Sequence, residues 1–222
     1  MRAAVPKLVL VILLLNAMTM WAQWDEGDDN RKSNGHLGLP ISIPLNPMGQ
    51  VALAGTGITY GAGYNFTKRH GVFGEFMWDW LHPNISSLPG TNSTEAHSNL
   101  YTFTGNYRYE LRGRLLGAYL LAGGGWYLRH STLTGSPVAV GSSITCTREW
   151  LWWGVTCTSG VVTDTRTLRS SWSSSPGVNG GIGFTIRVGD APWRMYVESR
   201  YHYAPNRYVN TQLVITTIGI RY

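Results

Sequence analysis

The sequence predicts an all-β fold, an eight-stranded antiparallel transmembrane β-barrel that follows an N-terminal signal peptide. Three observations predict it. Eight segments alternate between apolar and polar or small residues, the connections between them alternate in length, and aromatic residues gather at the segment ends. A period of two is typical of strands that face lipid on one side and a polar lumen on the other.

The N-terminus predicts export. Arg2 and Lys7 flank the start of the chain, and the apolar run that follows, residues 8–15, is too short to span a bilayer as a helix. We expect cleavage after Ala22. The expected divisions are a signal peptide (residues 1–22), a flexible polar tail (residues 23–35) and the barrel (residues 36–222).

The sequence argues against a nucleic-acid partner, a membrane-spanning helix and a bound metal or cofactor. The formal net charge is only +6 at pH 7, and no basic run or RNA-binding motif accompanies it, so a nucleic-acid partner is not expected. After residue 22 no stretch of roughly 18 consecutive apolar residues occurs, which excludes a membrane-spanning helix. The histidines are scattered without the spacing of metal ligands, and no metal or cofactor is predicted.

Turn-forming residues divide the rest of the chain into eight strand-like segments. Pro40 and Pro44 lie in the first, which must tolerate gaps in its ladder because proline donates no backbone hydrogen bond. The predicted strands are residues 36–45, 51–66, 71–82, 98–109, 115–129, 177–188, 193–203 and 211–222.

The connections between these strands alternate between short and long, as they do at the two ends of a bacterial membrane barrel. Residues 46–50 depart from this order, because they are short where a longer connection is expected. An even strand number places both chain ends on the same side. The short set is residues 67–70, 110–114 and 189–192, and the long set is residues 83–97, 130–176 and 204–210.

The aromatic residues distinguish a membrane barrel from a soluble sandwich or calycin-type barrel, whose apolar face would point inward. They gather near both ends of the apolar face, and aliphatic residues such as Ile58, Leu120 and Ile182 lie between them. Trp and Tyr prefer the two interfaces of a bilayer in this way. The outer belt is Trp78, Trp80, Tyr101, Trp126, Tyr201 and Tyr203, and the inner belt is Tyr64, Phe66, Tyr107, Tyr109, Trp193 and Tyr222.

The opposite face carries charges of both signs and many glycines, which would make room for long side chains. Charges at mid-depth are costly against lipid, so this face is expected to line the lumen. The lumen of an eight-stranded barrel is just wide enough for side chains to fill it, and we therefore expect an ion-pair network that blocks it. Its predicted members are Glu75, Asp79, Arg187, Glu198, Arg200 and Arg221.

The last strand, V-I-T-T-I-G-I-R-Y at residues 214–222, ends on an aromatic residue of the apolar face. With MYVESRYHY at 195–203 and GVFGEFMWDW at 71–80, it resembles the small eight-stranded outer-membrane proteins of the OmpA and OmpX type. The resemblance implies a place in the bacterial outer membrane and contact with its lipid and lipopolysaccharide. It also implies that the barrel assembly machinery recognises Ile218, Ile220 and Tyr222.

The longest connection contains both cysteines of the chain. In an exported protein Cys146 and Cys157 are expected to form one disulfide, which encloses Trp150, Trp152 and Trp153. Two interpretations of the tryptophans stay open. They pack on the rim of a hairpin-like extension, or they form an exposed surface for an extracellular ligand.

No catalytic site is predicted. His130 and Ser131 are adjacent, so in a strand they point to opposite faces. Glu75 and Asp79 are about 13 Å apart along one strand, which is too far for a pair that shares a proton. We therefore expect a monomeric barrel, not an enzyme, with a structural or surface-interaction role. The alternatives are a narrow channel for small solutes and, less favoured, a lipid-modifying enzyme.

Overall fold

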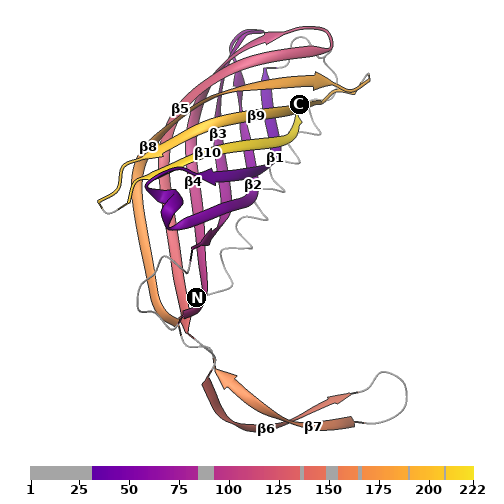
Figure 1. The fold of residues 1–222 in the computed structure, drawn as a ribbon. Helices are drawn as coiled ribbons and strands as arrows, with labels where there is room; N and C mark the ends of the chain where they lie inside the picture. Colours follow the sequence, from indigo (N-terminus) through magenta and orange to yellow (C-terminus); the bar gives the residue numbers. More distant parts are fainter. Residues whose placement is uncertain are drawn as a thin grey trace.

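The computed structural model describes residues 32–84, 93–135, 138–148, 155–164, 167–189, 191–207 and 209–222. Eight strands close into an antiparallel barrel in the order β1-β10-β9-β8-β5-β4-β3-β2, which confirms the predicted fold (Figure 1). The barrel strands are β1 (Ser33–Pro44), β2 (Ala52–Asn65), β3 (His70–Pro83), β4 (Ser93–Arg112), β5 (Leu116–Gly135), β8 (Thr167–Arg187), β9 (Arg194–Ala204) and β10 (Thr211–Arg221).

The first and last strands pair with each other and close the barrel. β1 pairs with β10, and Gly35 and Tyr222 exchange backbone hydrogen bonds of 3.3 and 3.1 Å. The predicted flexible tail is therefore wrong for Ser33 to Gly35, which are part of β1 because the last strand supplies their ladder partners. The signal peptide and the rest of the tail lie outside the described residues.

The two predicted faces of the wall are present in the structure. Buried positions include charged and polar side chains such as Glu75, Arg108 and Arg200, all of which point into the lumen. Large apolar side chains cover the outside, as expected of a surface that faces lipid. They include Ile58, Phe66, Phe103, Leu120, Trp126, Ile182, Val197 and Ile218.

Three neighbouring strands are longer than predicted. β4, β5 and β8 have 20, 20 and 21 residues, whereas β9 and β10 have 11 each. About 9–11 residues suffice to cross the hydrocarbon core. The three strands therefore continue beyond the membrane on the side opposite the start of β1 and the end of β10. We call this part the outer extension and define it as residues 93–99, 128–135 and 167–175.

The long connection contains a further two-stranded sheet, β6 (Val138–Arg148) and β7 (Val155–Asp164). It projects from the ends of β5 and β8, away from the barrel (Figure 1). Its register places Cys146 directly opposite Cys157. The tryptophans Trp150, Trp152 and Trp153 belong to the connection between β6 and β7, which lies outside the described residues.

The short first connection folds back into the barrel. It contains the 3-10 helix η1 (Met48–Gln50), and Met48 is buried in an apolar cluster within the outer half of the lumen. A short connection on the outer side is thus compatible with the barrel because it seals the lumen instead of extending outward. In the described part of the chain, no helix is long and apolar enough to cross a membrane.

The facing positions of Cys146 and Cys157 predict that the two thiols are oxidised to each other. Residues directly opposite in an antiparallel pair have Cα atoms about 4.5–5.5 Å apart, within the range that a disulfide bridges. Alkylation of denatured, unreduced protein from cells should label neither thiol in the wild type. In the control variant Cys146→Ser it should label Cys157. Labelling of two thiols in the wild type would disprove the pairing.

Glycines inside the barrel are expected to tolerate substitution less well than those outside. A Cβ atom at Gly125 would clash with the carbonyl oxygen of Phe103, whereas one at Gly105 would meet nothing within 4 Å. Gly125→Ala should lower the free energy of unfolding by about 1–3 kcal/mol, the usual effect of overpacking. Gly105→Ala is the matched control and should unfold like the wild type in a denaturant titration of barrel refolded in lipid vesicles.

Candidate functional site

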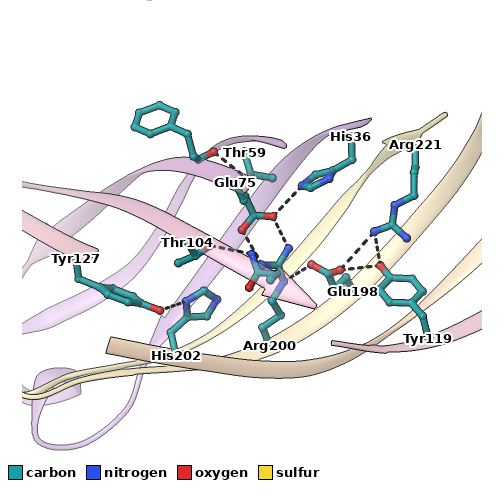
Figure 2. A network of polar contacts seen from close by, with 12 residues as sticks. His36, Thr59, Glu75, Thr104, Tyr119, Tyr127, Glu198, Arg200, His202 and Arg221 are labelled. Carbon is teal, nitrogen blue, oxygen red and sulfur yellow. Dashed lines mark hydrogen bonds and ion pairs between the residues drawn. The ribbon is translucent and has the colours of Figure 1, made fainter. Parts of the chain in front are cut away.

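An ion pair joins opposite walls at the centre of the lumen. Arg200 on β9 and Glu75 on β3 lie four strands apart in the closed order of eight, on directly opposite sides. Both terminal nitrogens of Arg200 donate to the carboxylate, Nη1 to Oε1 at 2.6 Å and Nη2 to Oε2 at 2.5 Å (Figure 2). This fork-like geometry is the strong form of a charge-assisted hydrogen bond, and it bridges the full width of the lumen.

A second acid extends this bridge toward β5 and β10. Arg200 Nε donates to Glu198 Oε1, while Glu198 Oε2 accepts a hydrogen bond of 2.7 Å from the Tyr119 hydroxyl. Arg221 Nη2 lies 3.7 Å from the same carboxylate oxygen and donates to the Tyr119 oxygen at 3.2 Å. Two arginines and two glutamates thus balance in one buried cluster (Figure 2).

Aromatic rings complete the surroundings of these charges. The Arg221 guanidinium carbon lies 4.4 Å from the ring centre of Tyr119 and 4.9 Å from that of Tyr196, which are cation–π contacts. His36 on β1 contacts Glu75 through Nε2 at 2.8 Å. Because a carboxylate only accepts, this contact assigns a proton to Nε2 of His36.

The central cluster, which we define as His36, Glu75, Tyr119, Glu198, Arg200 and Arg221, has glycines beside its rings. A Cβ atom at Gly61 would collide with the His36 ring, and one at Gly183 would collide with the Tyr119 ring. These two glycines therefore make the space that the large side chains occupy, as the sequence pattern predicted.

Above the central cluster, toward the outer extension, the lumen is filled by apolar side chains. Tyr127 marks the border, because its hydroxyl hydrogen-bonds to His202 Nδ1 at 2.9 Å while its ring packs into the apolar layer. This outer seal is Met48, Ala52, Met77, Leu81, Leu100, Tyr127, Ala204, Leu213 and Ile215.

Below the central cluster, at the end where β1 begins and β10 ends, the lumen carries a second set of ions. Arg108 Nε lies 3.3 Å from Glu110 Oε2, and Arg112 donates to both oxygens of Glu110 at 3.2 and 3.3 Å. Arg108 also donates to Asn65 at 3.2 Å. One carboxylate is therefore shared by two guanidinium groups at this mouth.

Four of the six residues predicted for the network meet in the central cluster: Glu75, Glu198, Arg200 and Arg221. Asp79 does not join them. It is fully buried four residues further along β3, beside the outer seal, and neither carboxylate oxygen has a hydrogen-bond partner among the described residues. Arg187 is half-buried near the opposite mouth, where the register pairs it with Arg194. The side chains of Asp79 and Arg187 both point into the lumen, but they lie at other depths along the barrel axis than the central cluster.

Sequence reasoning missed two members of the cluster, His36 and Tyr119. The alternation of side chains along each strand indicates that both residues point into the lumen. His36 alternates with Pro40 and Ser42 on the inner face of β1, and Tyr119 shares the parity of Gly123 and Gly125 on β5.

The outer extension holds a contact between His130 and Ser170. His130 Nε2 lies 3.0 Å from the Ser170 hydroxyl, and its ring stacks on Trp172 with centres 4.1 Å apart. Ser131 hydrogen-bonds instead to Ser98 at 2.9 Å, in line with the predicted opposite faces. Among the residues that the structure describes, no group of three or more His, Cys, Asp or Glu side chains could hold a metal ion.

The predicted assembly residues lie on the lipid-facing side of β10. Ile218 and Ile220 are exposed there. Tyr222 is half-buried, and its ring covers Gly35, where a Cβ atom would collide with the hydroxyl. The last side chain thus packs over the glycine of the strand that closes the barrel, in the way that aromatic residues stabilise edge glycines.

No family model and no curated protein matches the chain. Several solved structures do. Neisserial surface protein A is 13% identical, covers 85% of this chain and 95% of its own, and has a TM-score of 0.50. Ail, the attachment invasion locus protein of Yersinia pestis, is 14% identical over 86% and 98%, with a TM-score of 0.48. The N-terminal β-barrel domain of Pseudomonas aeruginosa OprF is 12% identical over the same shares, with a TM-score of 0.42.

The likeness to Neisserial surface protein A concerns the fold alone. It agrees with the closed eight-stranded barrel and with an exterior whose large side chains are apolar. The chain thus shares the fold of Neisserial surface protein A, a small closed β-barrel.

Proposed function

We propose that the protein is a closed outer-membrane barrel that acts at the cell surface and does not conduct solutes. The observation that carries the proposal is the bridge between Arg200 and Glu75, which crosses the lumen from one wall to the opposite one. An ion on its way through would have to separate these buried charges, which is costly because each would lose its partner in a medium of low polarity.

The outer seal supports the same conclusion. Leu100 and Leu213 are fully buried, and Met48 closes the layer from the first connection. A hydrated ion that passes the charged cluster would still have to cross a layer of mainly apolar side chains, with the buried carboxylate of Asp79 beside it. For this reason a narrow channel for small solutes is a less favoured function than the closed barrel.

The outer extension supports a role at the surface. Trp172 is 65% exposed and lies four residues beyond Pro176, the register partner of Trp126 in the outer aromatic belt. Four residues correspond to roughly 13 Å along the strand, so Trp172 lies beyond the outer aromatic belt, on the side away from the lipid. Exposed tryptophan is costly in water and enriched in binding hot spots.

An extracellular ligand is therefore proposed to bind the outer extension and the tip of the β6–β7 sheet. Trp150, Trp152 and Trp153 belong to the sequence that connects β6 to β7, and the proposed disulfide between Cys146 and Cys157 would close that connection. A lipid-modifying enzyme is the least favoured alternative, because the lumen carboxylates of Glu75, Glu110 and Glu198 are each held by arginine.

Removing one acid of the central cluster tests the closed lumen. Glu198→Ala deprives Arg221 of its carboxylate and Arg200 of one of two, so the free energy of unfolding should fall by roughly 3–5 kcal/mol. Glu198→Gln keeps an acceptor for Tyr119 and should lose less. In planar bilayers the wild type should show no steady current. Steady wild-type conductance in the nanosiemens range that Glu198→Ala leaves unchanged would favour the channel.

Two epitope insertions test which end of the barrel faces outward. An epitope placed after residue 151, between β6 and β7, should bind antibody on intact cells. The same epitope placed after Gly189, in the turn between β8 and β9, should bind antibody only after permeabilisation. Equal signals from both positions on intact cells, or a reversed pattern, would contradict the proposed topology.

A further inference from the structure

The mouth opposite the outer extension contains a small basic pocket. Its volume is about 100 Å³, and it lies between the turn that follows β2 and the end of β4. Its charged lining consists of Lys32, Lys68, Arg69, Arg108, Glu110 and Arg112. Five basic side chains thus face one acid. We call it the basic mouth.

The one acid among the described residues of this lining is shared by two of its arginines. Glu110 already accepts from Arg112 at 3.2 and 3.3 Å and lies 3.3 Å from Arg108. The Arg108 side chain is only 2% exposed. Its Nη1 has no hydrogen-bond partner among the described residues. A buried charged donor without an acceptor is costly, so the pocket lacks negative charge at this atom.

Hydrogen bonds hold the backbone of the segments that carry these basic residues. Asn65 N donates to the Lys32 carbonyl at 2.6 Å, and Glu110 N donates to the Arg69 carbonyl at 2.8 Å. Within the turn, the Thr67 hydroxyl accepts from the backbone nitrogens of Arg69 and His70 at 3.2 and 3.1 Å. The turn is therefore held to β4, and a ligand would need little reordering to bind.

We propose that the basic mouth binds one oxyanion, a phosphate or carboxylate group, that enters from the periplasmic side. The guanidinium groups of Arg69, Arg108 and Arg112 outnumber the one carboxylate of the described lining and select negative charge, and a small shift of the Arg108 side chain would offer its unpartnered Nη1 as a donor. The pocket has room for such a group, and the rest of a larger ligand would stay outside the mouth. The site is separate from the surface role proposed above and does not depend on it.

The test is a calorimetric titration of the full barrel, refolded in uncharged detergent, at constant ionic strength set with chloride. The probes are inorganic phosphate, glycerophosphoglycerol as a lipid headgroup, and N-acetyl-D-alanyl-D-alanine as a peptide carboxylate. We expect saturable binding of at least one probe, and the probe that binds tightest identifies the source of the anion. Absence of saturable binding of all three probes would overturn the proposal.

Three variants locate the binding. Arg108→Gln should weaken it about tenfold or more, as expected on loss of a charge-assisted hydrogen bond. Arg69→Gln removes a charge from the exposed turn without touching the lumen, and it should weaken binding several-fold in a barrel that folds normally. Arg114→Gln is the matched control, because this exposed residue lies near the same mouth but outside the lining. Equal weakening by Arg69→Gln and Arg114→Gln would mean that only overall charge matters, and would refute the site.

Discussion

The bidentate contact between Arg200 and Glu75 is the constraint on which the interior of this barrel depends. Backbone ladders join each strand only to its neighbours, whereas this contact joins β9 to β3 across the lumen. Once the guanidinium is buried at the centre, its remaining donor Nε requires an acceptor, and Glu198 supplies one. That acid in turn places Arg221 and Tyr119, so the identity of each inner residue follows from its partner on another strand.

The high glycine content is a consequence of the same filling. Side chains as large as His36 and Tyr119 fit inside because Gly61 and Gly183 stand beside their rings. Protein interiors are packed to the density of organic crystals, so each large residue in a narrow lumen needs a small one next to it. Glycines on the inner face are therefore packing positions and not points of flexibility.

Strand periodicity was sufficient to predict the closed barrel, its two faces and four residues of the central cluster, because each depends only on which way a side chain points. It could not predict the level at which Asp79 and Arg187 lie, since that depends on the stagger between strands. The lengths of β4, β5 and β8 were also missed. Their outer residues, such as Ser170 to Ser175, lack an apolar period, and pairing across the sheet alone makes them strand.

The two ends of the lumen differ in chemistry, and each therefore has a different role. The outer end is sealed by mainly apolar residues around Met48, which leave little space for a hydrated solute. The opposite end presents arginines around a shared Glu110, which attract an anion. The central cluster between them contains as many positive as negative side chains, so it offers no net charge to draw that anion onward. An anion in the basic mouth is thus held and not transported, because the field that attracts it ends at the neutral cluster.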